Sequence, residues 1–399
     1  MLQAYKYRIY PNKEQEILIW KHFGACRFVY NWALEQKIKS YNSDEVSLSC
    51  YMLNKKLPAL KIDFPWLKEV NSQSLQQANN NLDAAFTRFF REKKGFPKFK
   101  SKKNPLQSFQ APQHCAVDFV NGVLSLPKMK GIKTVFHRFF EGTIKTVTVS
   151  VTSTKKYFAS ILVDDGKEQP KIQPFNSTNI VGLDVGISSF VVLSTGEKID
   201  NPKYFRSSET RLAVLQRRMS RKKKGSKNFQ KAKLKVAKRY EMIANQRSDF
   251  LNKLSCKIAS ENQALAIEGL NVSGMLKNHR LAKSISDCSW SEFFRMLTYK
   301  TAKVGKTVLK IGRFDPSSKI CHVCGNINRD LTLADREWIC SECHTCHDRD
   351  VNAAINIKKF ALQEQNLVGV AGAERAEEPV DSLPLGRGMK QEAPPFRVG

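Results

Sequence analysis

The sequence has 399 residues, of which 41% are hydrophobic, so it is long enough for two or three domains with buried cores. Lys and Arg number 66 against 37 Asp and Glu, which gives a formal net charge of +29. This excess favours nucleic acid as a partner, because binding a polyanion relieves self-repulsion and releases condensed counterions. A basic surface kept only for solubility is the alternative.

Several protein classes are excluded by the pattern of apolar residues and cysteines. No run of eighteen apolar residues occurs, and residues 1–15 lack the apolar core of a signal peptide. Half of the ten cysteines lie between residues 321 and 346, which is not the dense framework of a secreted domain. We therefore expect no membrane span and a cytoplasmic protein, associated with the nucleoid if the source is a prokaryote.

The N-terminal part predicts β-structure that is interrupted by helices. Residues 2–10, LQAYKYRIY, alternate between apolar and polar side chains and end at Pro11, as a strand would. Residues 107–163 are also rich in strand formers, and segments 143–151 and 157–163 are expected to pair as a hairpin. Together these strands predict a small β-barrel or sheet, with the helices of 12–91 inserted after its first strand.

Residues 71–91 form the clearest predicted helix, with Ser72 available as its N-cap. Its apolar residues recur every three or four positions, at Leu75, Leu82, Phe86 and Phe89. The opposite face is rich in amides, namely Gln73, Gln76, Gln77, Asn79 and Asn80. Two interpretations are equally weighted: a polar face in solvent, or contacts to base edges, which amides can make with two hydrogen bonds.

Two basic segments are candidates for binding phosphates. The first, residues 91–104, interleaves basic residues with Phe96 and Phe99, which could stack on bases or only attach the loop to the core. Its candidate contacts are Lys93, Lys94, Lys98 and Lys100. The second, RRMSRKKKGSK at 217–227, is predicted to form the tip between two long basic helices within 203–260, with solvated surface as the alternative. Its candidate contacts are Arg217, Arg218, Arg221, Lys222, Lys223 and Lys224.

Two polar segments are expected to lack regular structure. Residues 164–179 contain prolines and polar residues and predict a linker between domains. Residues from 366 onwards are rich in Gly, Pro and Ala and show no periodicity, so we expect a disordered tail.

The cysteines between 321 and 343 have the spacing of a zinc site. Cys321 and Cys324 form one CxxC turn, and Cys340 and Cys343 form a second. Two such turns can bring four thiolates around one tetrahedral Zn²⁺, and a site closed by four protein ligands is structural. Cys346 also forms a CxxC with Cys343, and three histidines lie nearby, so a shifted ligand set is an alternative. The symmetry of the first two turns favours Cys321, Cys324, Cys340 and Cys343.

Acidic residues stand at the ends of two apolar, strand-like runs. Asp184 lies in IVGLDVG, and Glu268 lies in ALAIEGLN. A third acid, Asp350, precedes the helix-like segment VNAAINIKKFALQ. Each alone could be a cap or an ion-pair partner, but together they match the carboxylate set of an RNase H-type sheet.

Paired Mg²⁺ ions would explain why acids are needed at these positions. Two ions about 4 Å apart can activate water and stabilise the leaving 3′ oxygen in phosphodiester hydrolysis. Magnesium prefers carboxylate oxygen to sulfur, so the acids and the cysteines predict separate metals. Asp348 is an alternative to Asp350 as the third acid, and the spacing does not distinguish them.

Four motifs occur together in the C-terminal half: GLDVG, IEGLN, DPSSKICHVCG and HDRDVNAA. With YKYRIYPNKEQ near the start and FFREKKGFPKFKSKK after the amide-rich helix, they resemble the TnpB/OrfB family of transposon-encoded RNA-guided nucleases, relatives of the type V CRISPR effectors. The resemblance covers roughly residues 1–360. Cys346 departs from it, because the family more often has other residues at that position.

The resemblance implies an α/β multidomain protein with an RNase H-like (RuvC) nuclease domain, an inserted zinc ribbon, and an N-terminal wedge β-barrel holding a helical recognition insertion. It implies that Asp184, Glu268 and Asp350 are the catalytic, Mg²⁺-binding acids, and it selects Asp350 over Asp348. The expected segments are 1–11 (first barrel strand), 12–104 (recognition helices), 105–170 (remainder of the barrel), 171–320 (nuclease domain), 321–346 (zinc ribbon), 347–365 (final nuclease segment) and 366–399 (tail).

The implied activity is guide-directed cleavage of DNA. Members of the family bind a transposon-derived guide RNA, recognise a short motif beside a double-stranded target, and cut both strands through one active site. Base pairing with the guide would then read the sequence, while the protein holds the backbones. A catalytically silent RNA-guided DNA-binding repressor and a transposase that uses RNase H-like acids are the alternatives; the presence of all three acids argues against the first.

Overall fold

The computed structural model describes residues 1–372, apart from positions 105, 314 and 333. The chain divides into two compact units. The first comprises Met1–Lys171 and Lys203–Lys253, and the second comprises Ile172–Pro202 and the described residues between 254 and 372. The predicted nuclease segment 171–320 therefore contributes residues to both units.

The first unit is built on an antiparallel sheet of seven strands. In chain order they are β1 (Leu2–Tyr10), β2 (Gln107–Ala111), β3 (Ala116–Asp118), β4 (Val123–Leu126), β5 (Met129–Val135), β6 (Thr143–Val151) and β7 (Tyr157–Asp164). Their order across the sheet is β2-β6-β7-β1-β5-β4-β3. The predicted hairpin is confirmed as β6 and β7, and the N-terminal strand β1 lies between β7 and β5. The closed wedge barrel stays a prediction.

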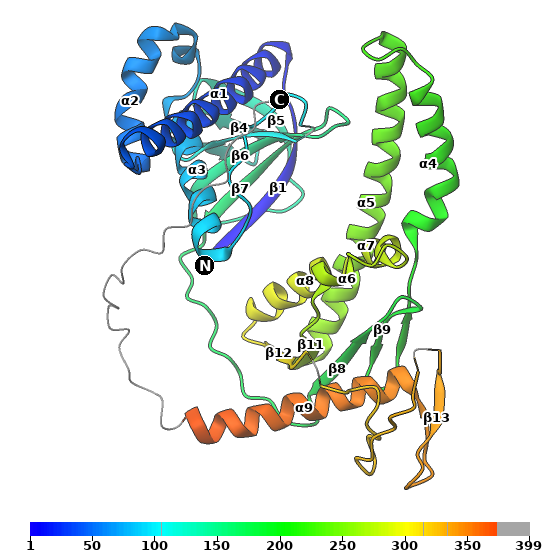
Figure 1. The fold of residues 1–399 in the computed structure, drawn as a ribbon. Coiled ribbons are helices and arrows are strands. Elements are labelled where there is room, and N and C mark those ends of the chain that lie inside the picture. The colour runs from blue at the N-terminus through cyan, green and yellow to red at the C-terminus, as the bar shows by residue number, and fades with distance from the viewer. Residues whose placement is uncertain (105, 314, 333, 373–399) are drawn as a thin grey trace. The chain divides into compact units, whose positions relative to one another are not determined.

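The helices between β1 and β2 belong to the same unit (Figure 1). They are α1 (Lys13–Asp44), α2 (Cys50–Asp63), the 3-10 turn η1 (Pro65–Glu69) and α3 (Ser72–Glu92). Leu75 and Leu82 of α3 are fully buried, as the apolar stripe predicts. The prediction of Ser72 as N-cap is wrong by one residue: Asn71 is the cap, because its side chain accepts the N–H of Gln73.

A long helical hairpin confirms the prediction for residues 203–260. Helix α4 (Tyr204–Ser220) and helix α5 (Lys227–Glu261) are joined by residues 221–226, where Gly225 adopts a φ of +85°. The division between the two units falls within α5. The basic segment 217–227 therefore occupies the tip of the hairpin.

The second unit contains a mixed sheet of five strands. In chain order they are β8 (Ile180–Val185), β9 (Ser189–Leu193), β10 (Lys198–Asp200), β11 (Ala264–Glu268) and β12 (Thr307–Ile311). Their order is β10-β9-β8-β11-β12, with β8, β11 and β12 parallel and the other pairs antiparallel. The central strands are apolar over most of their length because both faces of the sheet are covered.

Helices cover the two faces of this sheet. They are α8 (Trp290–Ala302) and α9 (Arg349–Gly372), and two short helices, α6 (Val272–Met275) and α7 (Ala282–Cys288), precede α8 in the chain. Helix α9 runs along one face, and α8 lies on the other (Figure 1). Phe190 of β9 meets Phe293 of α8 edge to face, with ring centroids 5.1 Å apart.

Gly182 sets the distance between β8 and α9. A Cβ atom there would lie 2.0 Å from the carbonyl oxygen of Ala354 and 2.8 Å from the backbone nitrogen of Lys358. No side chain larger than hydrogen fits at this point without a shift of the helix backbone. The strand that carries Asp184 is therefore in direct backbone contact with the helix that begins next to Asp350.

The segment between the sheet and α9 forms a small module with two short strands, β13 (Glu337–Ile339) and β14 (Cys346–Asp348). Helix α9 then runs as far as Gly372, so the prediction of a disordered tail from 366 is wrong for residues 366–372. Extending an existing packed helix costs little per residue, which explains the longer helix. The remainder of the predicted tail, residues 373–399, lies outside the described residues.

Across the described part of the chain, no helix has both the length and the apolar composition needed to cross a membrane.

Candidate functional site

Two of the three predicted acids lie at the same edge of the five-stranded sheet. Asp184 is the fifth residue of β8, and Glu268 is the last residue of β11. The parallel register pairs Leu183 with Ile267, so the two acids occupy the next level of neighbouring strands. The carboxyl ends of parallel strands are the usual position for a ligand site in an open α/β sheet.

The third acid reaches this edge from α9. Asp350 is in the first turn of the helix, one turn before Ala354, the residue in contact with Gly182. Asp184 lies two residues beyond Gly182, and the charge of Asp350 acts on it. Strand β8 and helix α9 therefore bring together acids that are 166 positions apart in the sequence (350 minus 184).

The three carboxylates form a region of concentrated negative charge. Burial, followed by the charges of Glu268 and Asp350, raises the pKa of Asp184 well above its ordinary value, while Arg349 opposes the shift. Asp184 retains some exposed surface, but its surroundings are mostly protein. A divalent cation would relieve this repulsion, so the donor set fits Mg²⁺.

Two of the acids also have neutral or cationic partners. The hydroxyl of Ser317 donates to Glu268 Oε1 at 2.7 Å, and Arg336 Nη1 lies 3.7 Å from Asp350 Oδ2. The oxygen atoms of the three acids lie farther apart than the sulfur atoms of the cysteine module. Among the described residues, only the four cysteines form a group of three or more ligand atoms that all lie within 4.8 Å of one another.

Asp348 has different surroundings from Asp350. Its Oδ1 accepts the backbone N–H of Val351 at 3.0 Å, which makes it the N-cap of α9, and its Oδ2 is paired with Lys198. Burial opposes ionisation, but Lys198 and the backbone N–H groups lower the pKa of Asp348 below its ordinary value. Spacing alone could not distinguish the two acids. In the structure Asp348 is the helix cap, and Asp350 is the neighbour of Asp184.

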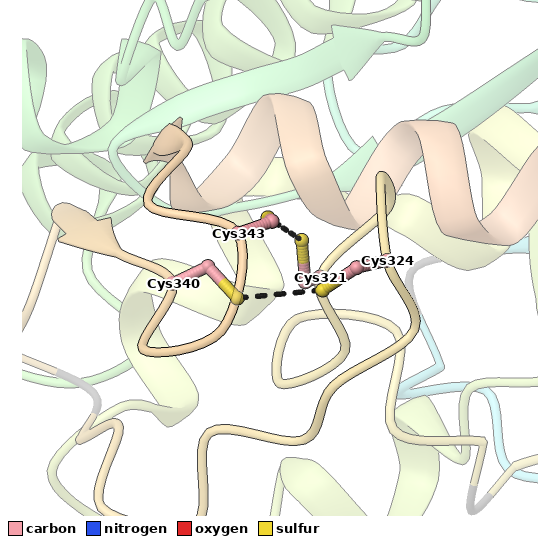
Figure 2. A group of neighbouring side chains, drawn as sticks. All are labelled: Cys321, Cys324, Cys340 and Cys343. Atoms are coloured by element: carbon pink, nitrogen blue, oxygen red, sulfur yellow. Dashed lines mark hydrogen bonds between the residues drawn. The ribbon is translucent and has the colours of Figure 1, made fainter.

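The four cysteines of the symmetric set come together in the small module (Figure 2). Their Sγ atoms all lie within 4.8 Å of one another, with Cys321 and Cys343 at 3.6 Å and Cys324 and Cys340 at 3.5 Å. Cys346 is exposed and is not a member of this group. All four are free thiols, and four sulfurs at these distances fit a tetrahedral Zn²⁺.

The thiols differ in their tendency to ionise. Hydrogen bonds from Thr345 lower the pKa of Cys343 to about 6. A backbone hydrogen bond from Asn326 favours the thiolate of Cys324, but burial and the neighbouring thiols raise the pKa to about 12. Four thiolates so close together require a cation, which again fits a zinc site.

Two buried asparagines of α9 bind the segment that leads into this module, and sequence reasoning did not identify them. Asn356 Nδ2 donates to the carbonyls of Ser317 and Ile320 at 2.7 and 2.6 Å. Asn352 Nδ2 donates to Ile320 at 2.8 Å, and its Oδ1 accepts the N–H of His322 at 3.0 Å. The available signal was their spacing of four residues, which places both amides on one face of a helix.

The amide-rich face of α3 contributes mainly to internal contacts. Gln73 Nε2 donates to Gln113 Oε1 at 2.7 Å, and Gln77 Oε1 accepts from Asn80 at 3.1 Å. Asn79 is fully buried and donates to Asn54 Oδ1 at 2.8 Å, so its place on an outer face was wrong. Gln76 alone of the three predicted glutamine contacts is exposed. The periodicity of the sequence predicts on which side of the helix a residue lies, but it does not predict whether another segment covers that side.

The basic loop 91–104 combines attachment and exposure. Phe96 packs edge to face on Phe86 and Phe89, which supports attachment to α3 for this ring, whereas Phe99 is 52% exposed. The ammonium of Lys100 lies 4.0 Å from the centroid of the Tyr30 ring, and burial lowers the pKa of this lysine. As whole residues all four predicted contacts, Lys93, Lys94, Lys98 and Lys100, are exposed, so the burial of Lys100 concerns its ammonium end.

The basic tip of the α4–α5 hairpin is open to solvent. All six predicted contacts there are exposed, namely Arg217, Arg218, Arg221, Lys222, Lys223 and Lys224. Within the part of the chain that the structure describes, none of the six forms an ion pair with an acid. Six cations without acidic partners form a strongly positive surface.

The second unit thus combines a mixed α/β sheet with acids at its carboxyl edge and a four-thiol module. The chain has a TM-score of 0.55 with a solved Cas12f1 chain from a complex with guide RNA and target DNA, at 15% identity, over 90% of this chain and 98% of that one. This likeness concerns the fold alone. A Cas12f1-like TNB domain model matches residues 290–357, which contain the thiol module.

Sequence comparison identifies the family. A model described as "Probable transposase" (OrfB of IS605) matches residues 160–279. A protein of Streptomyces pristinaespiralis named "Putative RNA-guided DNA endonuclease" is 42% identical over 90% of this chain and 89% of its own length. "Putative RNA-guided DNA endonuclease InsQ" of Escherichia coli K12 is 33% identical over 89% of this chain and 91% of its own. The chain belongs to the TnpB/OrfB family.

A third family model, named for a helix-turn-helix domain, matches residues 1–45. In the structure this segment consists of strand β1 and the single long helix α1. The matched segment therefore has one strand and one long helix in place of a pair of short helices.

Proposed function

We propose that this protein is a transposon-encoded, RNA-guided and Mg²⁺-dependent DNA endonuclease that cuts a double-stranded target next to a short recognition motif. The observation that carries the proposal is the placement of the three acids: Asp184 and Glu268 lie at the ends of neighbouring parallel strands, and Asp350 lies in the first turn of the helix that packs on β8. The chain that carries them belongs to the TnpB/OrfB family. The relatives named as RNA-guided DNA endonucleases support the same activity.

The catalytic part of the proposal assigns the three acids to an RNase H-like, RuvC-type site. Asp184, Glu268 and Asp350 would hold magnesium through their carboxylate oxygens. At this position magnesium would supply an activated water and would stabilise the departing 3′ oxygen of the cleaved phosphodiester. The scaffold holds one acid on each of two parallel strands and one on a packed helix, so their relative positions depend on rigid elements rather than loops.

The zinc part of the proposal gives Cys321, Cys324, Cys340 and Cys343 a structural role. Four protein ligands leave no position open for a substrate, so this zinc would stabilise the module without taking part in hydrolysis. The module is bonded to α9 through Asn352 and Asn356, close to the beginning of the helix that carries Asp350. A folded zinc ribbon would therefore support the position of that acid.

The nucleic-acid part of the proposal uses the exposed basic segments. The hairpin tip at 217–224 and the lysines at 93, 94 and 98 would hold phosphate backbones, while pairing with the guide reads the target sequence. In the first unit, a wedge-type barrel with the recognition helices α1–α3 would bind the guide RNA and the motif beside the target. Among the three predicted glutamines, Gln76 is the exposed one and could reach a base edge.

Substitution of Asp184 by alanine tests the catalytic assignment. The variant, purified with its guide RNA, should lose cleavage of a matched target in Mg²⁺ while keeping RNA and target binding within a few-fold of wild type. Binding is measured by filter retention and cleavage by gel analysis of both strands. Cleavage by the purified Asp184→Ala protein at the wild-type rate would contradict the assignment.

The same experiment separates the two alternatives. A silent RNA-guided repressor would bind the target but leave it uncut even as the wild-type protein in Mg²⁺. A transposase would yield joined DNA strands rather than free ends. The presence of all three acids favours a cutting enzyme over the repressor.

A further inference from the structure

Ser317 lies between strand β12 and the first cysteine of the thiol module, in the segment DPSSKIC. Its side chain is 5% exposed, and its hydroxyl donates to Glu268 Oε1 at 2.7 Å. We propose that Ser317 is a positioning residue for the nuclease site: it orients the Glu268 carboxylate for a divalent cation, and Asn356 in turn orients Ser317. This inference rests on the proposed function.

The need for such a contact follows from the position of Glu268. It is the last residue of β11 and is followed by Gly269, so no further strand residue restrains it. A glutamate has three side-chain torsions, and fixing them for cation binding costs conformational entropy. A hydrogen bond that already exists without the cation removes part of that cost.

The identity of the donor also matters. A serine hydroxyl is neutral, so it orients the carboxylate without cancelling the charge that attracts a cation. Because it engages Oε1, the other oxygen, Oε2, remains available as a ligand. Hydrogen bonds of this kind to metal-binding carboxylates commonly change metal affinity or activity by about 10- to 100-fold.

Ser317 is itself fixed by contacts at its backbone. Its carbonyl accepts from Asn356 Nδ2 at 2.7 Å, and its N–H donates to the carbonyl of Asp315 at 2.8 Å. Asn356 is 2% exposed and lies six residues after Asp350 on the same helix. Helix α9 therefore carries one acid directly and holds a second acid through Asn356 and Ser317.

The adjacent residue provides a matched control. Ser318 has the same side chain in the same segment, but among the described residues its hydroxyl makes no hydrogen bond and only its carbonyl accepts, from Asn352. Replacing Ser318 with alanine removes the same atom from the same loop. The structure thus predicts different outcomes for two neighbouring serines.

The test measures cation binding as well as cleavage. Mn²⁺ binding to the full-length zinc-containing protein is followed by electron paramagnetic resonance, and target cleavage by the guide complex is measured as a function of Mg²⁺ concentration. Ser317→Ala should weaken Mn²⁺ binding about tenfold and raise the Mg²⁺ concentration for half-maximal cleavage by a similar factor. Ser317→Thr, which keeps the hydroxyl, should recover most of the affinity, and Ser318→Ala should match wild type.

Two controls keep the result interpretable. Zinc content shows whether the module stays folded, and Ser317→Cys, which is similar in size but a weak donor, replaces Ser317→Ala if the alanine variant loses zinc. Wild-type Mn²⁺ affinity and an unchanged Mg²⁺ profile in a zinc-loaded Ser317→Ala or Ser317→Cys protein would overturn the inference. Asp184→Ala separates this result from the proposed function, because unchanged Mn²⁺ binding and cleavage in that variant would overturn the metal site itself.

Discussion

Asp184 occupies a strand whose preceding residues are all buried, and burial together with two neighbouring carboxylates raises its pKa. An ionised carboxylate in such surroundings opposes folding unless a cation or donor compensates. Glu268 and Asp350 have partners of their own in Ser317 and Arg336. The three carboxylates therefore repel one another in the protein alone, and binding of a divalent metal would make their arrangement favourable.

The two aspartates of HDRD should respond differently to substitution. Asp350→Ala should abolish cleavage, because it removes a proposed magnesium ligand. Asp348→Ala should retain cleavage but lower the free energy of unfolding by about 1 kcal/mol, because α9 loses its N-cap. Cleavage assays at a temperature well below the melting transition, together with thermal melting curves, measure both effects. An active Asp350→Ala protein, or an inactive but fully folded Asp348→Ala protein, would reverse the assignment.

Helix α9 has three functions along its length. Its N-terminus carries Asp350, its next turns contact Gly182 through the backbone, and Asn352 and Asn356 bind the loop that leads to the thiol module. This one element therefore joins the sheet, the acids and the cysteines of the second unit. A change in its distance from β8 would move the acids relative to one another.

Substitution of Gly182 by alanine tests this arrangement. The added methyl group would meet the carbonyl oxygen of Ala354, so we expect a loss of stability of at least about 1–3 kcal/mol and a loss of cleavage. Gly24→Ala is the control, because Gly24 lies within α1 and a Cβ atom there meets nothing within 4 Å. That variant should gain about 0.5–1 kcal/mol. Thermal melting compares them, and equal effects of the two substitutions would argue against close packing of α9 on β8.

The whole molecule carries a formal charge of +29, and the structure gives part of it a defined location. The six exposed basic residues at 217–224 project from the tip of a hairpin made of two long helices. A charged tip of this kind suits contacts with a phosphate backbone, which depend on charge more than on sequence. The affinity for guide RNA should therefore depend strongly on salt.

Neutralising the tip should weaken that dependence. Replacing Lys222, Lys223 and Lys224 with glutamine should reduce the slope of log affinity against log salt by about 1 for each phosphate that the protein no longer neutralises. Replacement of the same residues with arginine keeps the charge and should preserve the slope. Filter binding of guide RNA over a range of salt concentrations gives both slopes. A glutamine variant with the wild-type slope would show that the tip does not contact the RNA backbone.

The local features of this protein could be predicted from the sequence, because they depend on residues that are close in the chain. The period of two in 143–151, the CxxC turns and the basic segment between two helical stretches led to β6, the thiol module and the hairpin tip. The resemblance of four short motifs indicated the family that the comparisons show. The N-cap of α3 was misplaced by one residue because Asn71 and Ser72 are both good caps.

Features that depend on distant residues were decided by the tertiary structure. The distinction between Asp348 and Asp350 depends on Lys198, Val351 and the position of Asp184, none of which the spacing of the two acids reveals. The burial of Asn79 depends on Asn54 of another helix, and the contact of Ser317 with Glu268 joins residues 49 positions apart. Side-chain periodicity reports which face of an element a residue occupies, whereas the partner on that face is determined only when the chain folds.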